Sequence, residues 1–121
     1  MSRFILRQVL SGYKFDLTAA NGQVILSSEV YDTRSAAVKG IASVRTNAPK
    51  ARVEDQTGEG WATAAHPKFE LYQDRAGQYR FRLKARNGKI IGISESYTGK
   101  AGCLGGIESV MKNAPEAETE E

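Results

Sequence analysis

This chain of 121 residues has few of the residues that build covalent or metal-held structure. Its single cysteine, Cys103, excludes an internal disulfide. Its single histidine, His66, has no cysteine or carboxylate neighbour at ligand spacing, so we expect no metal site. No apolar run approaches the ~20 residues of a membrane-spanning helix, and Arg3 and Arg7 flank the short apolar start. We therefore expect no membrane contact, no signal peptide and a cytoplasmic location.

Strong charge and nucleotide-binding loops are also missing. The formal net charge is only +3, which does not demand a nucleic-acid partner. The sequence contains no GxGxxG motif, P-loop or nucleophile elbow, so we expect no cofactor. What the composition does provide is 40% hydrophobic and 26% charged residues, close to the globular average, which is enough for one folded core.

An internal repeat organises the chain. Residues 13–55 align with residues 79–121 at a constant offset of 66, with 19 identities in 43 positions and no gap. The repeat predicts two equivalent units, 1–55 and 69–121. The segment 56–68 between them is rich in glycine and has the composition of a linker.

Each unit begins with three predicted strands. The first is 4–10, or 69–74 in the second copy, and the next, 13–19 or 79–85, alternates strictly between apolar and polar residues. Asn21-Gly22 and Asn87-Gly88 then predict a type I′ hairpin turn, which would pair Ala19 with Val24. The third strand starts at Val24 or Ile90.

A helix follows in each copy, starting near Thr33 or Gly99. Gly40 and Gly106 fall inside the helices, where glycine is unfavourable, which indicates a close approach to the sheet. Asn47 and Asn113 are expected to stop the helices in the left-handed conformation. Short segments after them, 51–54 and 117–120, are candidate edge strands.

These elements predict an α+β fold in which two β3-α-β repeats form one antiparallel sheet with both helices on one face. Because one repeat alone has a thin core, we expect the copies to share the sheet around a pseudo-two-fold axis. Two copies in one chain can complete this sheet internally, so we expect a monomer.

The repeated phrases resemble the YegP-like family of small bacterial proteins. The resemblance rests on Ser94-Glu95-Ser96-Tyr97, on Gly106 to Val110, on Asn113-Ala114-Pro115 and on their looser counterparts in the first copy. It implies β3-α-β units, in tandem or as a dimer, that exchange their C-terminal strands within one sheet. The family is one of unknown function, so the resemblance assigns no functional residue.

Two corner motifs invite a catalytic interpretation. Ser28, Glu29 and Tyr31 recur as Ser94, Glu95 and Tyr97, which places a hydroxyl, a carboxylate and a phenol close together. We favour a structural role for them, in which Ser and Glu satisfy backbone amides and Tyr packs over the start of the helix. For Cys103 we likewise favour a buried thiol, because its equivalent in the first copy is Ala37.

The most suggestive set is a strand of alternating cations. Its alternation predicts that Arg80, Arg82, Lys84 and Arg86 share the face without helices, together with Tyr72, Ile91 and Ile93. Such a face is either a solvated surface, in which basic side chains cover apolar neighbours, or a surface that contacts phosphates and stacks bases. The acidic tail, 116–121, offsets most of the second copy's positive charge and is expected to cap a sheet edge or to fold back.

Three hypotheses follow for the function. The first is a non-catalytic binding or interaction module that acts through the open sheet face; the sequence leaves its partner open, with a protein among the candidates. The second is a nucleic-acid binder that uses the basic strand. The third and weakest is an enzyme built on the Ser-Glu-x-Tyr corners.

Overall fold

The computed structural model describes all residues, 1–121, as eight strands, two α-helices and one short 3₁₀ turn. The first repeat contains β1 (Arg3–Val9), β2 (Gly12–Thr18), β3 (Val24–Ser27), α1 (Arg34–Asn47), the 3₁₀ turn Ala48–Lys50 and β4 (Arg52–Asp55). The second contains β5 (Lys68–Gln73), β6 (Tyr79–Lys84), β7 (Ile90–Ile93), α2 (Lys100–Asn113) and β8 (Glu118–Glu120). The two helices are offset by 66 residues, as the repeat predicts.

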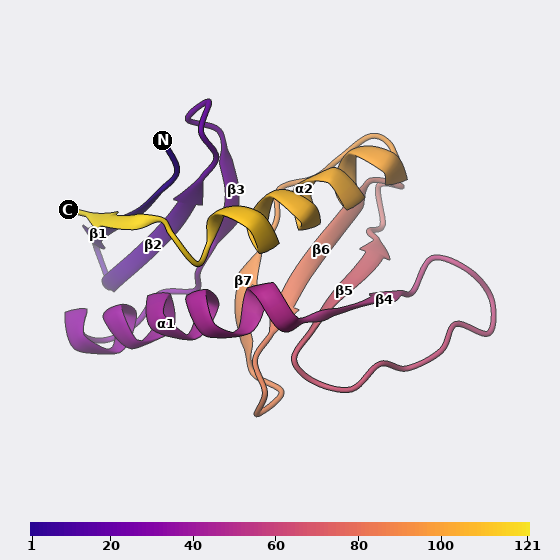
Figure 1. Cartoon of the computed structure of the whole chain (residues 1–121), viewed down its shortest axis with the longest axis horizontal. Coiled ribbons are helices and arrows are strands. Elements are labelled where there is room, and N and C mark those ends of the chain that lie inside the picture. The colour runs from indigo at the N-terminus through magenta and orange to yellow at the C-terminus, as the bar shows by residue number, and fades with distance from the viewer.

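All eight strands form one sheet in the order β4-β5-β6-β7-β3-β2-β1-β8, and both helices cross the same face of it (Figure 1). The predicted strand exchange is confirmed, because β4 pairs with β5 of the second repeat and β8 pairs with β1 of the first. The predicted all-antiparallel pairing needs one correction. Both exchanged strands run parallel to their partners, so the sheet is mixed.

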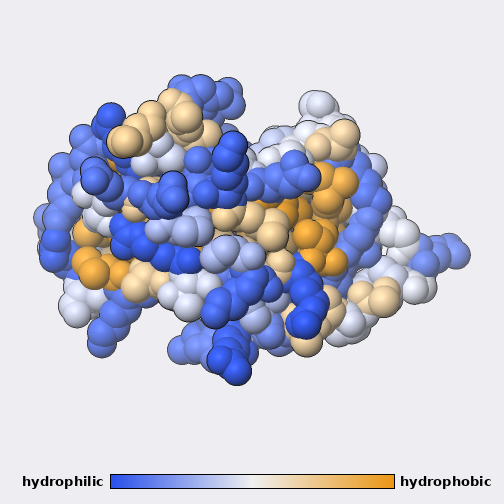
Figure 2. All heavy atoms as spheres, viewed as in Figure 1, coloured by the Kyte–Doolittle hydropathy of each residue, from blue (hydrophilic) through white to orange (hydrophobic).

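The core lies between the sheet and the helices. Phe4, Phe15, Phe69 and Phe81 are fully buried, and each repeat contains one edge-to-face pair, with ring centroids 5.9 and 5.7 Å apart. Figure 2 shows the same layering from the helix side, where hydrophilic residues cover the outer surface and apolar atoms appear in the gaps. Each helix has 14 residues, and neither has the length and hydropathy of a membrane-spanning segment.

The Asn-Gly turns differ from the predicted type I′ geometry. Only the glycines have positive φ, 85° at Gly22 and 84° at Gly88, so the asparagines keep ordinary backbone angles. The Gly22 amide donates to Ala19 O and the Ala19 amide to Gln23 O, which is the pattern of a type I turn followed by a glycine bulge. The bulge pairs Thr18, rather than Ala19, with Val24.

The helix ends also differ from the prediction. Asn47 has φ −87° and is not left-handed; its side-chain amide donates to Ser43 O at 2.8 Å. Asn113 makes the same bond to Ser109 O. The helix start is as predicted in the first repeat, where Thr33 accepts a hydrogen bond from the Ala36 amide.

The two repeats meet at the centre of the sheet, where β3 pairs with β7 through Ser27 and Ile93. Leu26 and Gly92 occupy equivalent repeat positions on these strands. A Cβ atom at Gly92 would lie 2.5 Å from Leu26 Cγ, so the leucine fills the space that the glycine leaves. The pseudo-two-fold axis therefore brings together two different residues.

The close approach predicted at the mid-helix glycines is present. A Cβ at Gly106 would lie 2.8 Å from Tyr97 Cζ and 3.1 Å from the Phe81 ring, whereas nothing lies within 4 Å of a Cβ at its neighbour Gly105. We expect Gly105→Ala to raise the free energy of unfolding by about 0.5–1 kcal/mol through helix propensity. We expect Gly106→Ala to lower it by about 1–3 kcal/mol through overpacking. Urea unfolding of the two variants tests this, and equal effects would contradict it.

Candidate functional site

In each Ser-Glu-x-Tyr corner the serine and the tyrosine contact the sheet of their own repeat. The tyrosine hydroxyl approaches the glycine in the middle of the helix, beyond the predicted contact with the helix start, and the glutamate side chain does not accept the predicted bonds from backbone amides. Ser28 Oγ accepts a hydrogen bond from the Phe15 amide at 2.9 Å and donates to Glu29 O at 2.7 Å. Tyr31 pairs with Tyr13 through the backbone and stacks on Phe15, with ring centroids 6.1 Å apart. The second copy repeats these contacts through Ser94, Glu95 and Tyr97. Backbone and packing contacts thus occupy both serines and the rings of both tyrosines.

The three cations of the basic strand β6 lie on the helix-free face of the sheet, where they pair with two carboxylates. Arg80 Nε lies 2.8 Å from Asp74 Oδ2. Arg82 Nε lies 2.5 Å and Lys84 Nζ 3.2 Å from the same carboxylate, Glu70. The sequence pattern indicated the cations but not these partners, because the carboxylates belong to the adjacent strand and turn.

Two residues of the predicted set lie elsewhere. β6 ends at Lys84, so Arg86 belongs to the hairpin turn and not to the strand face. Ile91 is buried in the core on the helix side, whereas Ile93 pairs with Arg82 on the helix-free face. The cause is the bulge opposite Leu83 and Lys84, which pairs Ile90 with Lys84 and turns Ile91 inward.

Tyr72 does join the basic strand. It pairs with Arg80 across β5 and β6, and the Arg82 guanidinium lies over its ring, 4.6 Å from the centroid. A cation over an aromatic face is attracted by the ring's negative quadrupole, which adds to the ion pair with Glu70. The two side chains therefore hold each other in place on the helix-free face.

Below this pair lies a buried charge network that the sequence did not indicate. Glu54, Lys68 and Glu70 are only 1%, 6% and 4% exposed at their side chains. Lys68 Nζ lies 2.7 Å from Glu54 Oε1 and 3.2 Å from Glu70 Oε2. The alternation along β5 is typical of a strand with one solvated face and gives no sign of this burial. The linker explains part of the burial, since Gln56 and the Ala64 amide donate to the two oxygens of Glu54.

The network keeps its carboxylates ionised. Burial alone would raise the pKa of Glu54, but hydrogen bonds from Lys68, Gln56 and the Ala64 amide lower it to about 2. Burial would also raise the pKa of Glu70, but hydrogen bonds from Arg82, Lys84 and Lys68 outweigh it and lower the pKa. The Glu54 hydrogen bond in turn raises the pKa of Lys68.

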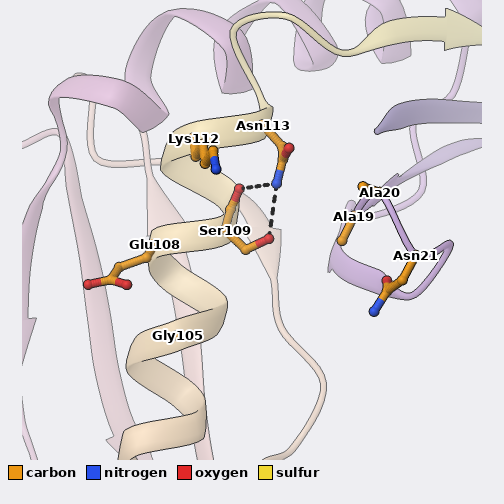
Figure 3. Close-up of a pocket in the computed structure, with 8 residues that line it drawn as sticks. All are labelled: Ala19, Ala20, Asn21, Gly105, Glu108, Ser109, Lys112 and Asn113. Carbon is orange, nitrogen blue, oxygen red and sulfur yellow. Dashed lines mark hydrogen bonds between the residues drawn. The ribbon is translucent and has the colours of Figure 1, made fainter. Parts of the chain in front are cut away.

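Two equivalent grooves lie on the helix side, each between one repeat's helix and the other repeat's hairpin. The α1 groove, between α1 and the β6–β7 hairpin, has a volume of ≈ 830 Å³. Its equivalent, the α2 groove, lies between α2 and the β2–β3 hairpin and includes a hollow of ≈ 440 Å³. Figure 3 shows Asn21 and Ala20 of that hairpin facing Ser109 and Asn113 of the helix across an open gap.

The remaining candidate residues are placed as follows. Cys103 is fully buried, and burial raises the pKa of its thiol to about 11, which fits the predicted structural role. His66 is exposed in the linker. No three His, Cys, Asp or Glu side chains are grouped so that they could hold a metal ion. The acidic tail lies at the sheet edge opposite β4, where Arg3 binds Glu120 and Arg34 binds Glu121.

Two repeats that exchange edge strands within one sheet define a tandem-repeat α+β protein with a bare sheet face and a pair of grooves. The chain belongs to the family described as "Domain of unknown function (DUF1508)", which matches residues 11–55 and 74–121. The resemblance to YegP-like proteins is thereby confirmed.

The similar proteins named here carry no assigned function in their names. A UPF0339 protein of Photorhabdus laumondii is 43% identical over 101 residues, covering 84% of this chain and 75% of the relative. A UPF0339 protein of Treponema denticola is 62% identical over 50 residues, which cover 86% of it but 41% of this chain, so that relative has the length of one repeat. The solution structure of YegP from E. coli, a protein of unknown function, superposes with a TM-score of 0.80 at 32% identity, covering 98% of this chain and 90% of that one.

The buried network gives a pH prediction. The pKa of Glu54 is about 2 in the folded chain and near the ordinary value of 4.5 when unfolded, so its ionised form stabilises the fold above pH 4.5. This contribution is lost as the pH falls from about 4.5 to about 2. We expect Glu54→Gln to lower the free energy of unfolding at pH 7 by roughly 1–3 kcal/mol, since Lys68 loses a charged partner.

The difference in the free energy of unfolding between Glu54→Gln and the parent protein should become smaller in acid. Urea unfolding at pH 7, 4 and 2.5 should show the variant approaching the parent protein as the pH falls. Glu59→Gln, in the exposed part of the linker, serves as the control and should behave as the parent at each pH. A difference for Glu54→Gln that stays constant with pH would contradict the assignment.

Proposed function

We propose that this protein is a non-catalytic interaction module that binds a protein partner on the helix-free face of its second repeat. The observation that carries the proposal is the stack of Arg82 on Tyr72 above the buried carboxylate of Glu70. Around it, Arg80, Arg82 and Lys84 remain 37%, 30% and 24% exposed at their side chains.

This surface has the properties of a preformed contact site. Arginine and tyrosine are enriched in protein interfaces and among the residues that dominate binding energy. Ordering a long side chain on binding costs about 0.5–1.5 kcal/mol, and the ion pairs with Asp74 and Glu70 have already ordered three of them. A partner therefore meets side chains that are held in place.

The charge balance favours protein over nucleic acid. Affinity for nucleic acid depends mainly on cations that replace the counterions of phosphates. Here each cation of β6 already pairs with Asp74 or with the shared carboxylate Glu70, which weakens its attraction for a phosphate. A surface of paired charges around an aromatic ring suits the mixed surface of a protein.

The proposal also includes a non-catalytic role, a monomeric state and a cytoplasmic location. The corner serines make hydrogen bonds to the backbone in both repeats, which supports a structural rather than catalytic use of these motifs. The strand exchange within one chain supports a monomer. The free, buried Cys103 supports a location in the reducing cytoplasm.

Covalent capture followed by reconstitution tests the proposal. The parent chain is cross-linked in nuclease-treated extract, and any captured protein is identified, purified and titrated by calorimetry. We expect a 1:1 complex that weakens at least tenfold for Tyr72→Ala/Arg80→Gln, because the variant removes the ring under Arg82 and one exposed guanidinium.

The matched control is Lys14→Gln, the position equivalent to Arg80 in the first repeat. It should bind within twofold of the parent. The proposal fails if the purified protein binds both variants equally. It also fails if labelled single- or double-stranded oligonucleotides bind the parent at physiological salt, in anisotropy, and lose affinity with Tyr72→Ala/Arg80→Gln, which would assign this face to nucleic acid.

A further inference from the structure

The two helix-side grooves are equivalent by the repeat, but their charges differ. Four positions at the α1 groove carry cations that their repeat equivalents lack: Lys39, Lys84, Arg86 and Lys89 stand in place of Gly105, Thr18, Ala20 and Gln23. Of these, Lys39, Lys84 and Lys89 line the groove, and Arg86 lies in the turn between two lining residues. On the α2 side the charged lining residues are Glu95, Glu108 and Lys112.

Two of the α1-groove cations are available to a ligand. Lys84 is held by Glu70 at 3.2 Å. Lys39 and Lys89 are exposed, come from opposite walls of the groove, and have no carboxylate within 4.0 Å. Glu29 is the one carboxylate residue in the lining. The two free ammonium groups therefore leave the groove a net positive charge.

A neutral donor lies between these walls. Tyr31 lines the groove, and its ring is fixed by the stack on Phe15 and by the close approach of Gly40. The hydroxyl makes no hydrogen bond within the chain and is not sealed from solvent. Burial, and then the charge of Glu29, raises the pKa of Tyr31, so the phenol keeps its proton at neutral pH.

We propose that the α1 groove is a binding site for a small phosphate-bearing ligand. Lys39 and Lys89 would neutralise the phosphate from two sides, and the Tyr31 hydroxyl would donate a hydrogen bond to one of its oxygens. The volume of ≈ 830 Å³ is within the range of small-molecule sites, ~300–1,000 Å³. The α2 groove, which lacks both cations, does not share this function.

The phosphate site shares only Lys84 with the proposed protein contact, and Lys84 is not one of the proposed phosphate ligands. The grooves lie on the helix side of the sheet, and the Tyr72–Arg82 stack lies on the opposite face. The two ideas are tested on different variants, so that either can fail without the other.

An NMR titration of the full ¹⁵N-labelled chain with inorganic phosphate and pyrophosphate tests the site, with ionic strength kept constant. We expect saturable shifts in the amides around Lys39 to Ser43 and Asn87 to Ile90. Lys39→Gln/Lys89→Gln should weaken pyrophosphate binding at least tenfold. Tyr31→Phe, which keeps the stacked ring, should weaken it roughly two- to tenfold, the effect of one hydrogen bond.

Matched control variants distinguish binding at the α1 groove from nonspecific attraction of phosphate to positive charge. Lys50→Gln/Lys112→Gln removes the same charge outside the α1 groove, and Tyr97→Phe removes the equivalent hydroxyl in the α2 groove. Both should bind within twofold of the parent. Equal weakening by the two double variants, or shifts spread over the lysines of the whole surface, would overturn the proposal, as would no saturable shift.

A converse variant tests the reason for the asymmetry. Gly105→Lys/Gln23→Lys places both cations in the α2 groove, and Gly105 has open space for a side chain. We expect a second set of pyrophosphate-dependent shifts, around residues 105–109 and 21–24. Their absence in the folded variant would show that these cations do not define the site, and would overturn the assignment.

Discussion

The exchange of edge strands is the constraint on which the rest of this structure depends. β4 leaves its own repeat to pair with β5, and β8 crosses back to β1, so each repeat's last strand completes the other's sheet. Each helix consequently faces the hairpin of the opposite repeat, and that geometry creates the two grooves. Neither groove exists within a single repeat. The association of two repeats therefore forms the two grooves as well as the shared core.

Much of this architecture could be predicted from the sequence, because the repeat and the period-two alternation act locally. The turn type could not, since Asn-Gly is compatible with both a type I′ turn and a type I turn with a bulge. That one-residue difference in register is why Ile91 faces the core while Ile90 lies beside Lys84. A small error in a turn thus became an error about which residues form the exposed face.

The burial of charge escaped prediction for a different reason. Lys68 and Glu70 alternate with Phe69 and Leu71, a pattern typical of a strand with one solvated face. They are buried because the parallel strand β4 brings Glu54 alongside and because distant segments cover the group. These contacts join segments that are distant in the sequence. The local sequence pattern is the same for a charge that is buried and paired as for one that is exposed to solvent. For the same reason, the sequence did not indicate the two carboxylates that pair with the basic strand.

The contact between Leu26 and Gly92 has a consequence for how the two halves can pair. In a symmetric pair of identical single repeats, the axis would bring two leucines or two glycines together, which gives either a clash or a void. In one chain the two positions need not carry the same residue, and here a leucine fills the space that a glycine leaves. Each half is therefore the specific complement of the other. A half that was separated and paired with a copy of itself would lose this fit.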